Sequence, residues 1–293
     1  MVVFLILHYM VDKVTETCVD SILRLKGNKK IVIVDNKSPN DSYEKLKEYY
    51  KDNNDVILIQ NSDNLGFAKG NNAGYDYIKE HFENVKFIVV MNNDMEIKQD
   101  DFIEKIYESY KEDKFYVLAP DVFSVEKGIH QNPESKDNEI KDIEKIDNMI
   151  NYIKNKSITK LKIKGFLKRF KPLVKLVYVI KSKKKNADGK YLKKQYNCTF
   201  HGSCLIFSEL FIKEREYCFY PKTRFYCESQ ILEYECNKSN WLRVYNPDMH
   251  VLHYEDIATN ARYKSYVERL KFQSDCLVES LEAFKELIQK DEK

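Results

Sequence analysis

Apolar runs of strand length alternate with stretches of helical periodicity through residues 1–125. The apolar runs occupy residues 2–7, 31–34, 56–59, 87–91 and 115–119, and the helical stretches occupy residues 15–25, 43–50, 68–81 and 102–111. Continuous apolar runs are typical of strands that are buried on both faces of a parallel sheet. Their alternation with helices predicts a doubly wound α/β sheet.

The pattern changes after residue 125. Residues 126–196 form a charged stretch followed by a basic one, which we interpret as an insertion. Regular patterns then resume, with a strand at residues 199–207, a helix over Glu228–Lys238, short strands near residues 242–245 and 250–253, and a C-terminal helix over residues 262–290. The length of 293 residues suits one large α/β domain with an insertion and a helical tail.

Polar residues directly follow four of the predicted strands. These positions are His8-Tyr9, Asp35-Asn36, the segment 60–66 and Asn92-Asn93-Asp94. In doubly wound sheets, ligands bind beyond the carboxyl ends of the strands. These residues are therefore the first candidates for binding or catalysis.

Asp35 and the segment 64–74 are each open to two interpretations. The Asp35 carboxylate can accept a hydrogen bond from the N3–H of uracil or thymine, or it can cap a helix or form an Asx turn. The segment 64–74 holds three of the eight glycines. Gly66 precedes a predicted helix, where a glycine lets a ligand approach the backbone, and Lys69 can meet a phosphate. The alternative for this segment is a turn whose glycines pack a helix.

Asn92-Asn93-Asp94 ends an apolar strand. A carboxylate with neighbouring amides at a strand end suits a divalent cation that is shared with a diphosphate. Asn and Asp are also common in turns, so the tripeptide alone is a weak signal.

Six segments carry a stronger signal together than any of them carries alone. They are VDNKSPND at 34–41, NLGFAKGNNAG at 64–74, MNNDMEI at 91–97, FHGSCLIFSELF at 200–211, RFYCESQIL at 224–232 and NPDMHVLHYEDIAT at 246–259. In order and spacing they resemble the inverting glycosyltransferases of family 2, which have the GT-A fold. The nearest subgroup is the rhamnosyltransferase-like and capsule-polysaccharide enzymes.

The resemblance implies an α/β fold, a GT-A-type doubly wound mixed sheet (Rossmann-like) with a basic insertion and a C-terminal helix. Residues 1–125 would form the nucleotide-sugar-binding half, and residues 197–259 the acceptor and catalytic half of the same domain. Residues 126–196 would be the insertion, and residues 260–293 a helical tail.

The resemblance also implies roles for single residues. Asp94 would be the remaining carboxylate of a D-x-D metal motif whose first Asp is Asn92 here, and His253 matches a histidine that completes the metal or diphosphate site. The cofactor would be a divalent cation, Mn²⁺ or Mg²⁺, and a His ligand favours Mn²⁺ somewhat. With the strand-end positions included, the donor-binding residues would be His8, Tyr9, Asp35, Asn64, Gly66, Lys69, Asn72, Asn92 and Asn93.

Glu228 is the expected catalytic base. Many relatives carry Glu-Asp where this chain has Glu228-Ser229, and the Asp is often the base. Ser229 cannot act as a base at neutral pH without an activating partner, so Glu228 is the only carboxylate left in the motif. The alternative is that Glu228 only stabilises the positive end of the following helix. His201 and Gly202 would lie on the acceptor side.

The implied reaction moves a hexosyl or deoxyhexosyl group, with inversion, from a UDP- or dTDP-sugar to a hydroxyl of a glycan or lipid-linked glycan acceptor. Such a reaction would serve surface or capsular polysaccharide synthesis. Three alternatives stay open. The first is a catalytically silent, sugar-nucleotide-binding protein of the same fold, suggested by Asn92 and Ser229. The second is a nucleotidyltransferase, and the third is an adaptor that binds a membrane or nucleic acid through residues 154–185.

Charge is concentrated in one segment. Residues 154–185 contain 13 Lys or Arg and no Asp or Glu, so a net charge of +3 leaves −10 on the rest of the chain. About a dozen large apolar residues interleave with these cations, which is typical of an amphipathic segment on an anionic membrane surface. A solvated loop and a nucleic-acid site are the alternatives, but we find no nucleic-acid-binding motif and expect no such partner.

Seven scattered cysteines without a C-x-x-C pair indicate reduced thiols in a cytosolic protein. The apolar start, MVVFLILHYM, is too short for a signal peptide or a membrane span, and the sequence has no run of about 18 apolar residues. We therefore expect a cytoplasmic protein that is peripheral on the cytoplasmic face of the membrane. The C-terminal helix can pack on the domain or mediate an oligomer, so the oligomeric state stays open.

Overall fold

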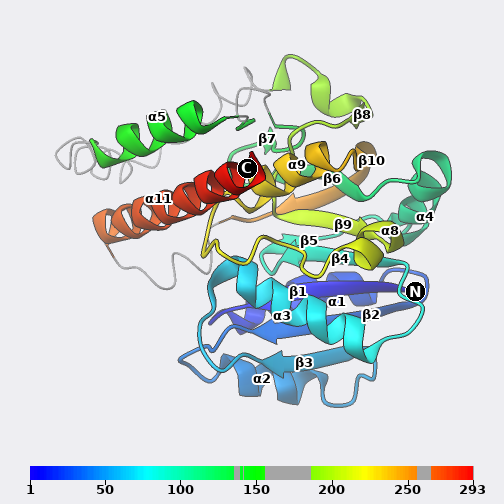
Figure 1. The fold of residues 1–293 in the computed structure, drawn as a ribbon. Helices are drawn as coiled ribbons and strands as arrows, with labels where there is room; N and C mark the ends of the chain where they lie inside the picture. The colour runs from blue at the N-terminus through cyan, green and yellow to red at the C-terminus, as the bar shows by residue number, and fades with distance from the viewer. Residues whose placement is uncertain (135–138, 141, 156–185, 256–264, 293) are drawn as a thin grey trace.

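The computed structural model describes residues 1–134, 139–140, 142–155, 186–255 and 265–292, and these form a mixed α/β fold around one sheet of ten strands (Figure 1). In chain order the elements are β1 (Val2–His8), α1 (Asp12–Leu23), β2 (Lys29–Asp35), α2 (Ser42–Tyr50), β3 (Val56–Gln60), α3 (Gly66–His81), β4 (Phe87–Asn92), β5 (Met95–Glu96), α4 (Phe102–Asp113), β6 (Val117–Ser124), β7 (Ile129–His130), α5 (Ile143–Lys154), η2 (Lys190–Leu192), β8 (Gln195–Tyr196), β9 (Cys204–Ser208), α8 (Glu209–Glu214), α9 (Glu228–Lys238), β10 (Arg243–His253) and α11 (Tyr266–Asp291).

The strand order is β3-β2-β1-β4-β9-β6-β10-β5, with β7 paired to β6 and β8 paired to β10. The first four strands in this order are parallel to one another. β9 runs antiparallel between β4 and β6, and β10 is parallel to β6. The predicted doubly wound mixed sheet is confirmed.

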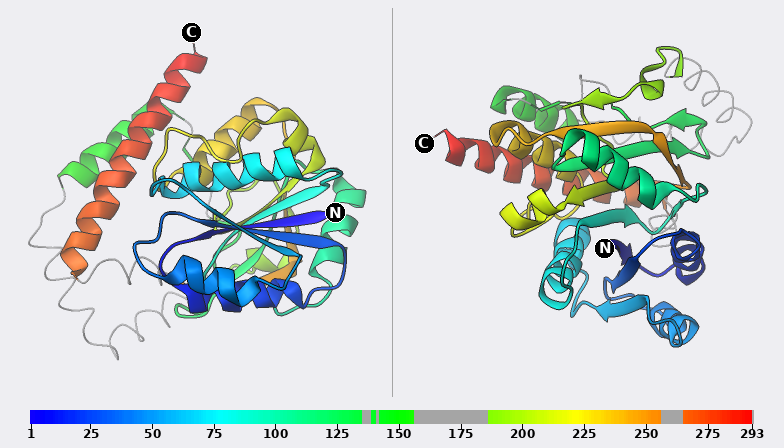
Figure 2. Two further views of the ribbon diagram at one scale, coloured as in Figure 1. Left: turned by 90° about the horizontal axis from the view of Figure 1, so that it is seen from below. Right: turned by 90° about the vertical axis from the view of Figure 1, so that its right-hand side faces the viewer.

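Two apolar layers cover the two faces of the sheet, because successive side chains of a strand point to opposite faces. Val2, Phe4 and Ile6 of β1 join a core with α1, α2 and α4. Val3 and Leu5 join a second core with α3, α8 and α9. Figure 2 shows α3 on one side of the sheet and α1 with α2 on the other. This two-sided burial explains why the strands are continuous apolar runs.

A third apolar cluster joins α5 to α11. Ile146 and Ile150 of α5 and Leu281, Phe284 and Ile288 of α11 are buried in this cluster. The two helices lie side by side beyond the end of the sheet toward which β1 points (Figures 1 and 2). They therefore stand next to the carboxyl ends of the parallel strands.

The second half differs in detail from the prediction. The two short strands expected near residues 242–245 and 250–253 are one strand, β10, whose register shifts between Asn246 and His250. Pro247 lies within the shift, and proline lacks the N–H that a regular ladder needs. The strand expected at residues 199–207 begins only at Cys204. Irregular backbone is harder to predict than its apolar flanks.

Parts of the segment 126–196 belong to the same sheet, because β7 pairs with β6 and β8 pairs with β10. Of the basic segment 154–185, only residues 154 and 155 are among the described residues. Of the C-terminal helix predicted over residues 262–290, the structure describes the part from residue 265 onward. None of the helices in the described ranges combines the length and the apolar character that crossing a bilayer requires.

Candidate active site

A cavity of about 830 Å³ lies at the carboxyl ends of β1 and β4. The direction in which successive strands are added reverses here, because β2 and β3 follow on one side of β1 and β4 lies on its other side. Such a switch point leaves a crevice in which ligands bind. Leu7 of β1, Asn92 of β4 and Asn36, which directly follows β2, line the cavity. Helices α5, α9 and α11 also contribute residues to its wall.

Nine of the fourteen residues that were given a binding, catalytic or metal role from the sequence line this one cavity. They are Tyr9, Asn64, Asn92, Asn93, Asp94, His201, Gly202, Glu228 and His253. Five others are not among its lining residues, namely His8, Asp35, Gly66, Lys69 and Asn72. The fold thus brings most of the candidates together from positions far apart in the chain.

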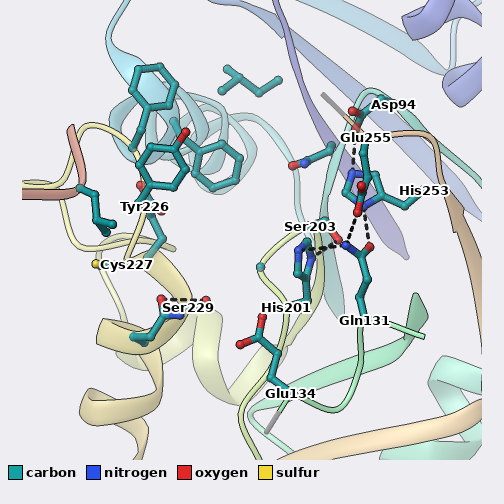
Figure 3. A pocket seen from close by; sticks show the side chains of 18 of the residues that line it. Asp94, Gln131, Glu134, His201, Ser203, Tyr226, Cys227, Ser229, His253 and Glu255 are labelled. Atoms are coloured by element: carbon teal, nitrogen blue, oxygen red, sulfur yellow. Dashed lines mark hydrogen bonds and ion pairs between the residues drawn. The ribbon is translucent and has the colours of Figure 1, made fainter. Parts of the chain in front are cut away.

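Asp94 and His253 face each other at the polar end of the cavity (Figure 3). Nε2 of His253 lies 3.3 Å from Oδ1 of Asp94, and both side chains are largely buried. Strands β10 and β5 set this distance, because His253 pairs with Met95, the residue after Asp94. The backbone of Tyr254 also donates a hydrogen bond to the Asp94 carbonyl, at 2.9 Å.

The Asp94–His253 pair fits a divalent cation that brings further ligands with it. Oδ1 of Asp94 is buried and has no hydrogen-bond partner among the described residues. The described part of the chain contains no group of three or more His, Cys, Asp or Glu side chains that could hold a metal. A hard cation often takes its remaining oxygen ligands from substrate phosphates and water. The pair is therefore adequate for a cation shared with a diphosphate, and not for a closed structural site.

Glu228 begins α9 and is buried at the wall of the same cavity. Burial disfavours the charged carboxylate and raises the pKa of Glu228 to about 7. Tyr226 and Cys227 directly before it have positive φ angles of 75° and 64°, a conformation that non-glycine residues rarely adopt. Both residues line the cavity, as do the first residues of α9. A carboxyl with a pKa near neutrality is suited to proton transfer.

His8 and Asp35 are held by bonds within the protein. The His8 ring nitrogens lie 2.7 Å from the Thr15 hydroxyl and 2.9 Å from the Ser42 hydroxyl. Burial lowers the pKa of His8 to about 4, so its ring is neutral at physiological pH. The Asp35 carboxylate accepts hydrogen bonds from the backbone and hydroxyl of Ser38 and from the Gln60 amide. The interpretation of Asp35 as a local turn former thus has direct support.

The glycines of the segment 64–74 are required by close packing. A Cβ at Gly66 would lie 2.5 Å from the carbonyl oxygen of Arg224, and one at Gly74 would lie 2.2 Å from a Leu5 methyl carbon. The side chain of Asn72 bonds to the backbone of Cys218 and Phe219. These contacts join α3 to the sheet and to the second half of the chain.

Sequence reasoning missed several residues of the cavity. Gln131 lies between His253 and Glu255, and Lys127 forms an ion pair with Glu255. Asn36 was named from the sequence only as a strand-end residue, and it holds the loop after β3, because its side chain bonds to Asn61, Asn64, Leu65 and Gly66. The exposed Lys69 was expected to meet phosphate, yet the lysines that line the cavity are Lys127 and Lys145.

The opposite end of the cavity is apolar. Its wall includes Ile140, Met149, Phe225, Phe272 and Leu277. A smaller groove that shares Lys145, Met149 and Leu277 with the cavity continues along α5. The cavity thus combines a polar end, suited to a charged ligand, with an apolar end next to α5 and α11.

The fold is that of solved glycosyltransferases. The chain aligns with the crystal structure of S. aureus TarS 1-349 at 14% identity and a TM-score of 0.53, covering 97% of this chain and 69% of that one. A structure of the same protein in complex with UDP aligns at 11% identity and a TM-score of 0.52, with the same coverage. GalNAc-T7 with UDP, GalNAc and Mn²⁺ aligns at 10% identity and a TM-score of 0.56, covering 88% of this chain and 43% of that one.

No curated protein sequence matches the chain. The model of the family described as "Glycosyl transferase family 2" matches residues 4–203, which is more than half of the chain. The match spans the strand ends that carry Asp35, Asn92 and Asp94, and it ends at Ser203 on the cavity wall. The chain is a member of glycosyl transferase family 2, with the GT-A fold and the nucleotide-sugar chemistry of a glycosyltransferase.

Proposed function

We propose that this protein transfers a hexosyl or deoxyhexosyl group from a UDP- or dTDP-sugar to a hydroxyl of a glycan acceptor, with inversion and with a divalent cation. The observation that carries the proposal is a single cavity that holds both a cation-suited pair, Asp94 and His253, and a buried carboxyl, Glu228. Leaving-group stabilisation and proton removal are the two tasks that such a displacement requires.

Asp94 and His253 would hold Mn²⁺ or Mg²⁺. When bound there, the cation supplies positive charge against the negative charge that grows on the departing diphosphate. Lys127 lines the same end of the cavity and can add charge to it. Support for a cation also comes from the GalNAc-T7 structure, whose ligands include UDP and Mn²⁺.

Tyr9, Asn64, Asn92 and Asn93 line the cavity near this pair and are proposed to contact the donor. Asp35 is proposed to recognise the base, for which it would have to exchange a bond to Ser38 or Gln60. His8, Gly66 and Asn72 would act by holding the loops that surround the donor, and Lys69 would act from outside the cavity wall.

Glu228 is proposed to take the proton of the acceptor hydroxyl as the hydroxyl attacks the anomeric carbon. His201 and Gly202 are proposed to contact the acceptor, and a Cβ at Gly202 would lie 3.5 Å from Cβ of Ser229. The loop at residues 201–202 and the start of α9 therefore form one continuous wall.

The apolar end of the cavity supports an acceptor with an apolar portion, such as a lipid-linked glycan. Met149, Phe272 and Leu277 would contact the apolar portion while the glycan hydroxyl reaches Glu228. We also propose that residues 154–185, by their composition, bind an anionic membrane surface on its cytoplasmic face. Both features suit an enzyme of surface or capsular polysaccharide synthesis.

A second candidate is a donor-binding protein without transferase activity. It is favoured by Ser229, which stands where many relatives have the catalytic Asp. Under this alternative, nucleotide sugar would bind but no nucleoside diphosphate would be released.

Release of nucleoside diphosphate from UDP- and dTDP-sugars separates these candidates. We expect release that requires Mn²⁺ or Mg²⁺, that EDTA abolishes, and that Asp94→Ala reduces by at least about 10-fold, because the variant lacks the site's only charged ligand. Binding without release would favour the second candidate. Release that neither EDTA nor Asp94→Ala affects would remove the metal role, and release of pyrophosphate from a nucleoside triphosphate would indicate a nucleotidyltransferase.

A further inference from the structure

Gln131 stands at the centre of a buried chain of polar side chains (Figure 3). Its Oε1 lies 2.7 Å from Nδ1 of His253, and its Nε2 lies 2.5 Å from Oε1 of Glu255. Gln131, His253 and Glu255 are each only 5–6% exposed. Water therefore has little access to compete for these hydrogen bonds, and the side chains themselves determine which group donates and which accepts.

Glu255 and His253 determine the orientation of the Gln131 amide. Its third contact, from Nε2 of Gln131 to Nε2 of His201 at 3.4 Å, involves a ring nitrogen that can donate or accept. A carboxylate only accepts hydrogen bonds, so the Glu255 oxygen requires the NH₂ group of Gln131. The carbonyl oxygen of Gln131 must then face His253, and a carbonyl only accepts. Nδ1 of His253 is therefore the nitrogen that carries the hydrogen. The opposite amide orientation would place two acceptors against each other at Glu255.

This orientation determines what Nε2 of His253 presents to Asp94. In a neutral imidazole with hydrogen on Nδ1, Nε2 carries a lone pair. That lone pair lies 3.3 Å from Oδ1 of Asp94, a buried oxygen that has no hydrogen-bond partner in the described ranges. Two acceptors at this distance repel each other unless a cation lies between them.

We propose that Gln131, itself oriented by Glu255, is a positioning residue that fixes the tautomer of His253 and so prepares Nε2 as a metal ligand. This proposal rests on the metal role in the proposed function. The partner of a metal-ligating histidine normally fixes its ring in this way, and removing such a partner typically weakens metal affinity about 10- to 100-fold. Gln131 touches neither donor nor acceptor in this role.

The competing explanation is structural. His253 could be doubly protonated and form an ion pair with Asp94, in which case Gln131 would only fill space and satisfy Nδ1. The two explanations differ in the metal-free protein, because only the first requires a bare Nε2.

The first experiment is long-range ¹⁵N–¹H NMR of histidine-labelled, metal-free protein at pH 8. The chain has six histidines, so assignment by a His253→Gln spectrum is practical. We expect His253 with hydrogen on Nδ1 and an unprotonated Nε2 in the wild type, and a mixture of tautomers in Gln131→Met. A His253 that carries hydrogen on both nitrogens, or only on Nε2, would overturn the proposal.

The second experiment is titration with Mn²⁺ in the presence of UDP, followed by the EPR signal of free Mn²⁺. We expect Gln131→Met to weaken Mn²⁺ binding about 10- to 100-fold. Gln195→Met is the matched control, because Gln195 lies in β8 and is not among the residues that line the cavity. We expect the control to bind Mn²⁺ like the wild type.

If Gln131→Met does not fold, exchanging the side chains of residues 131 and 255 tests the same hydrogen bonds. Gln131→Glu alone would place two carboxylates together and should bind Mn²⁺ poorly. Gln131→Glu combined with Glu255→Gln restores an acceptor for Nδ1 of His253 and a donor for that acceptor, so we expect affinity within several-fold of the wild type. If the double variant binds Mn²⁺ no better than Gln131→Glu alone, the proposed positioning of His253 by Gln131 and Glu255 is contradicted.

The outcomes separate this proposal from the proposed function. If Gln131→Met binds Mn²⁺ like the wild type while Asp94→Ala and His253→Ala do not, the positioning role is wrong and the metal site stands. If Asp94→Ala and His253→Ala also bind Mn²⁺ like the wild type, the metal site itself is wrong.

Discussion

At the scale of single residues, the candidate chemistry depends on carboxyl groups in buried positions. Glu228 is the clearest case, because burial at the start of α9 raises its pKa to about 7. The raised pKa means that the carboxyl is largely protonated below pH 7 and becomes a competent base above it. Asp94 differs, since it would be charge-compensated by a bound cation.

We predict that kcat/KM for transfer rises with pH through about 7, because Glu228 must lose its proton before it can accept one. Glu228→Gln should lower kcat by about 10²- to 10⁴-fold and remove this rise, while the affinity for UDP stays unchanged. Glu80→Gln, an exposed change on α3, is the control and should behave like the wild type. A wild-type profile without a rise near pH 7, or an active Glu228→Gln, would refute the base assignment.

Residue roles were predictable only where a motif carried them. Asn92, Asp94, Glu228 and His253 were found from the sequence and line one cavity. Gln131 could not be found in this way, because its bonds to His253 and Glu255 join residues 122 and 124 positions apart. A sequence also does not show which polar side chains are hydrogen-bonded to distant residues of the same protein. The bond of Asp35 to Gln60 appears only when β2 and β3 are paired, whereas its bonds to Ser38 are local and agree with the turn interpretation of Asp35.

At the scale of elements, the start of α3, directly after the loop that follows β3, is in close backbone contact with the second half of the chain. Gly66 begins α3 with a φ of 80°, and Phe67 donates a backbone hydrogen bond to the Arg224 carbonyl at 2.7 Å. The segment that leads to Glu228 therefore rests against the start of α3. The position of Glu228, the proposed base, depends on this contact.

We predict that Gly66→Ala destabilises the protein more than Gly189→Ala. Both glycines have positive φ, which costs an alanine about 1–3 kcal/mol. Only Gly66 adds a clash, because its Cβ would lie 2.5 Å from a backbone oxygen, whereas the nearest atom at Gly189 is 3.9 Å away. Urea denaturation of the two variants measures the difference. Equal losses would show that the close approach to Arg224 does not contribute to stability.

Most elements were predictable because their patterns are local. The strand runs and α9 follow from apolar periodicity, and α9 has the predicted bounds Glu228–Lys238. β10 was predicted as two strands because Asn246, Pro247 and Asp248 resemble a turn, whereas pairing with β6 continues on both sides of them. Pairing with a distant strand overrides a local turn signal.

At the scale of the whole molecule, the cavity is assembled from both halves of the chain and is closed on one side by α5 and α11. Phe284 of α11 is fully buried in the apolar cluster that joins α5 to α11. Its ring centroid lies 5.5 Å from that of Tyr234 in α9. The packing of α5 therefore depends on a helix more than 100 residues later in the chain.

We predict that Phe284→Ala lowers stability by about 3–5 kcal/mol and exposes the amides of α5 to hydrogen exchange. The amides of α1, α2 and β1–β3 should keep their protection, because they belong to other apolar clusters. Phe284→Leu is the milder control and should lose less. Exchange that rises equally throughout the chain would indicate that α5 and α11 do not form a separate cooperative unit.

The most direct test of the central claim is a thermal-shift panel of UDP-, dTDP- and GDP-sugars, each with Mn²⁺ and with EDTA. Ligand binding raises the melting temperature by an amount that grows with ligand concentration relative to Kd. We predict that a UDP- or dTDP-sugar raises the Tm of the wild type with Mn²⁺, with a much smaller rise in EDTA or in Asp94→Ala. No shift with any nucleotide sugar, or an equal shift in EDTA and in Asp94→Ala, would contradict a metal-dependent donor site at this cavity.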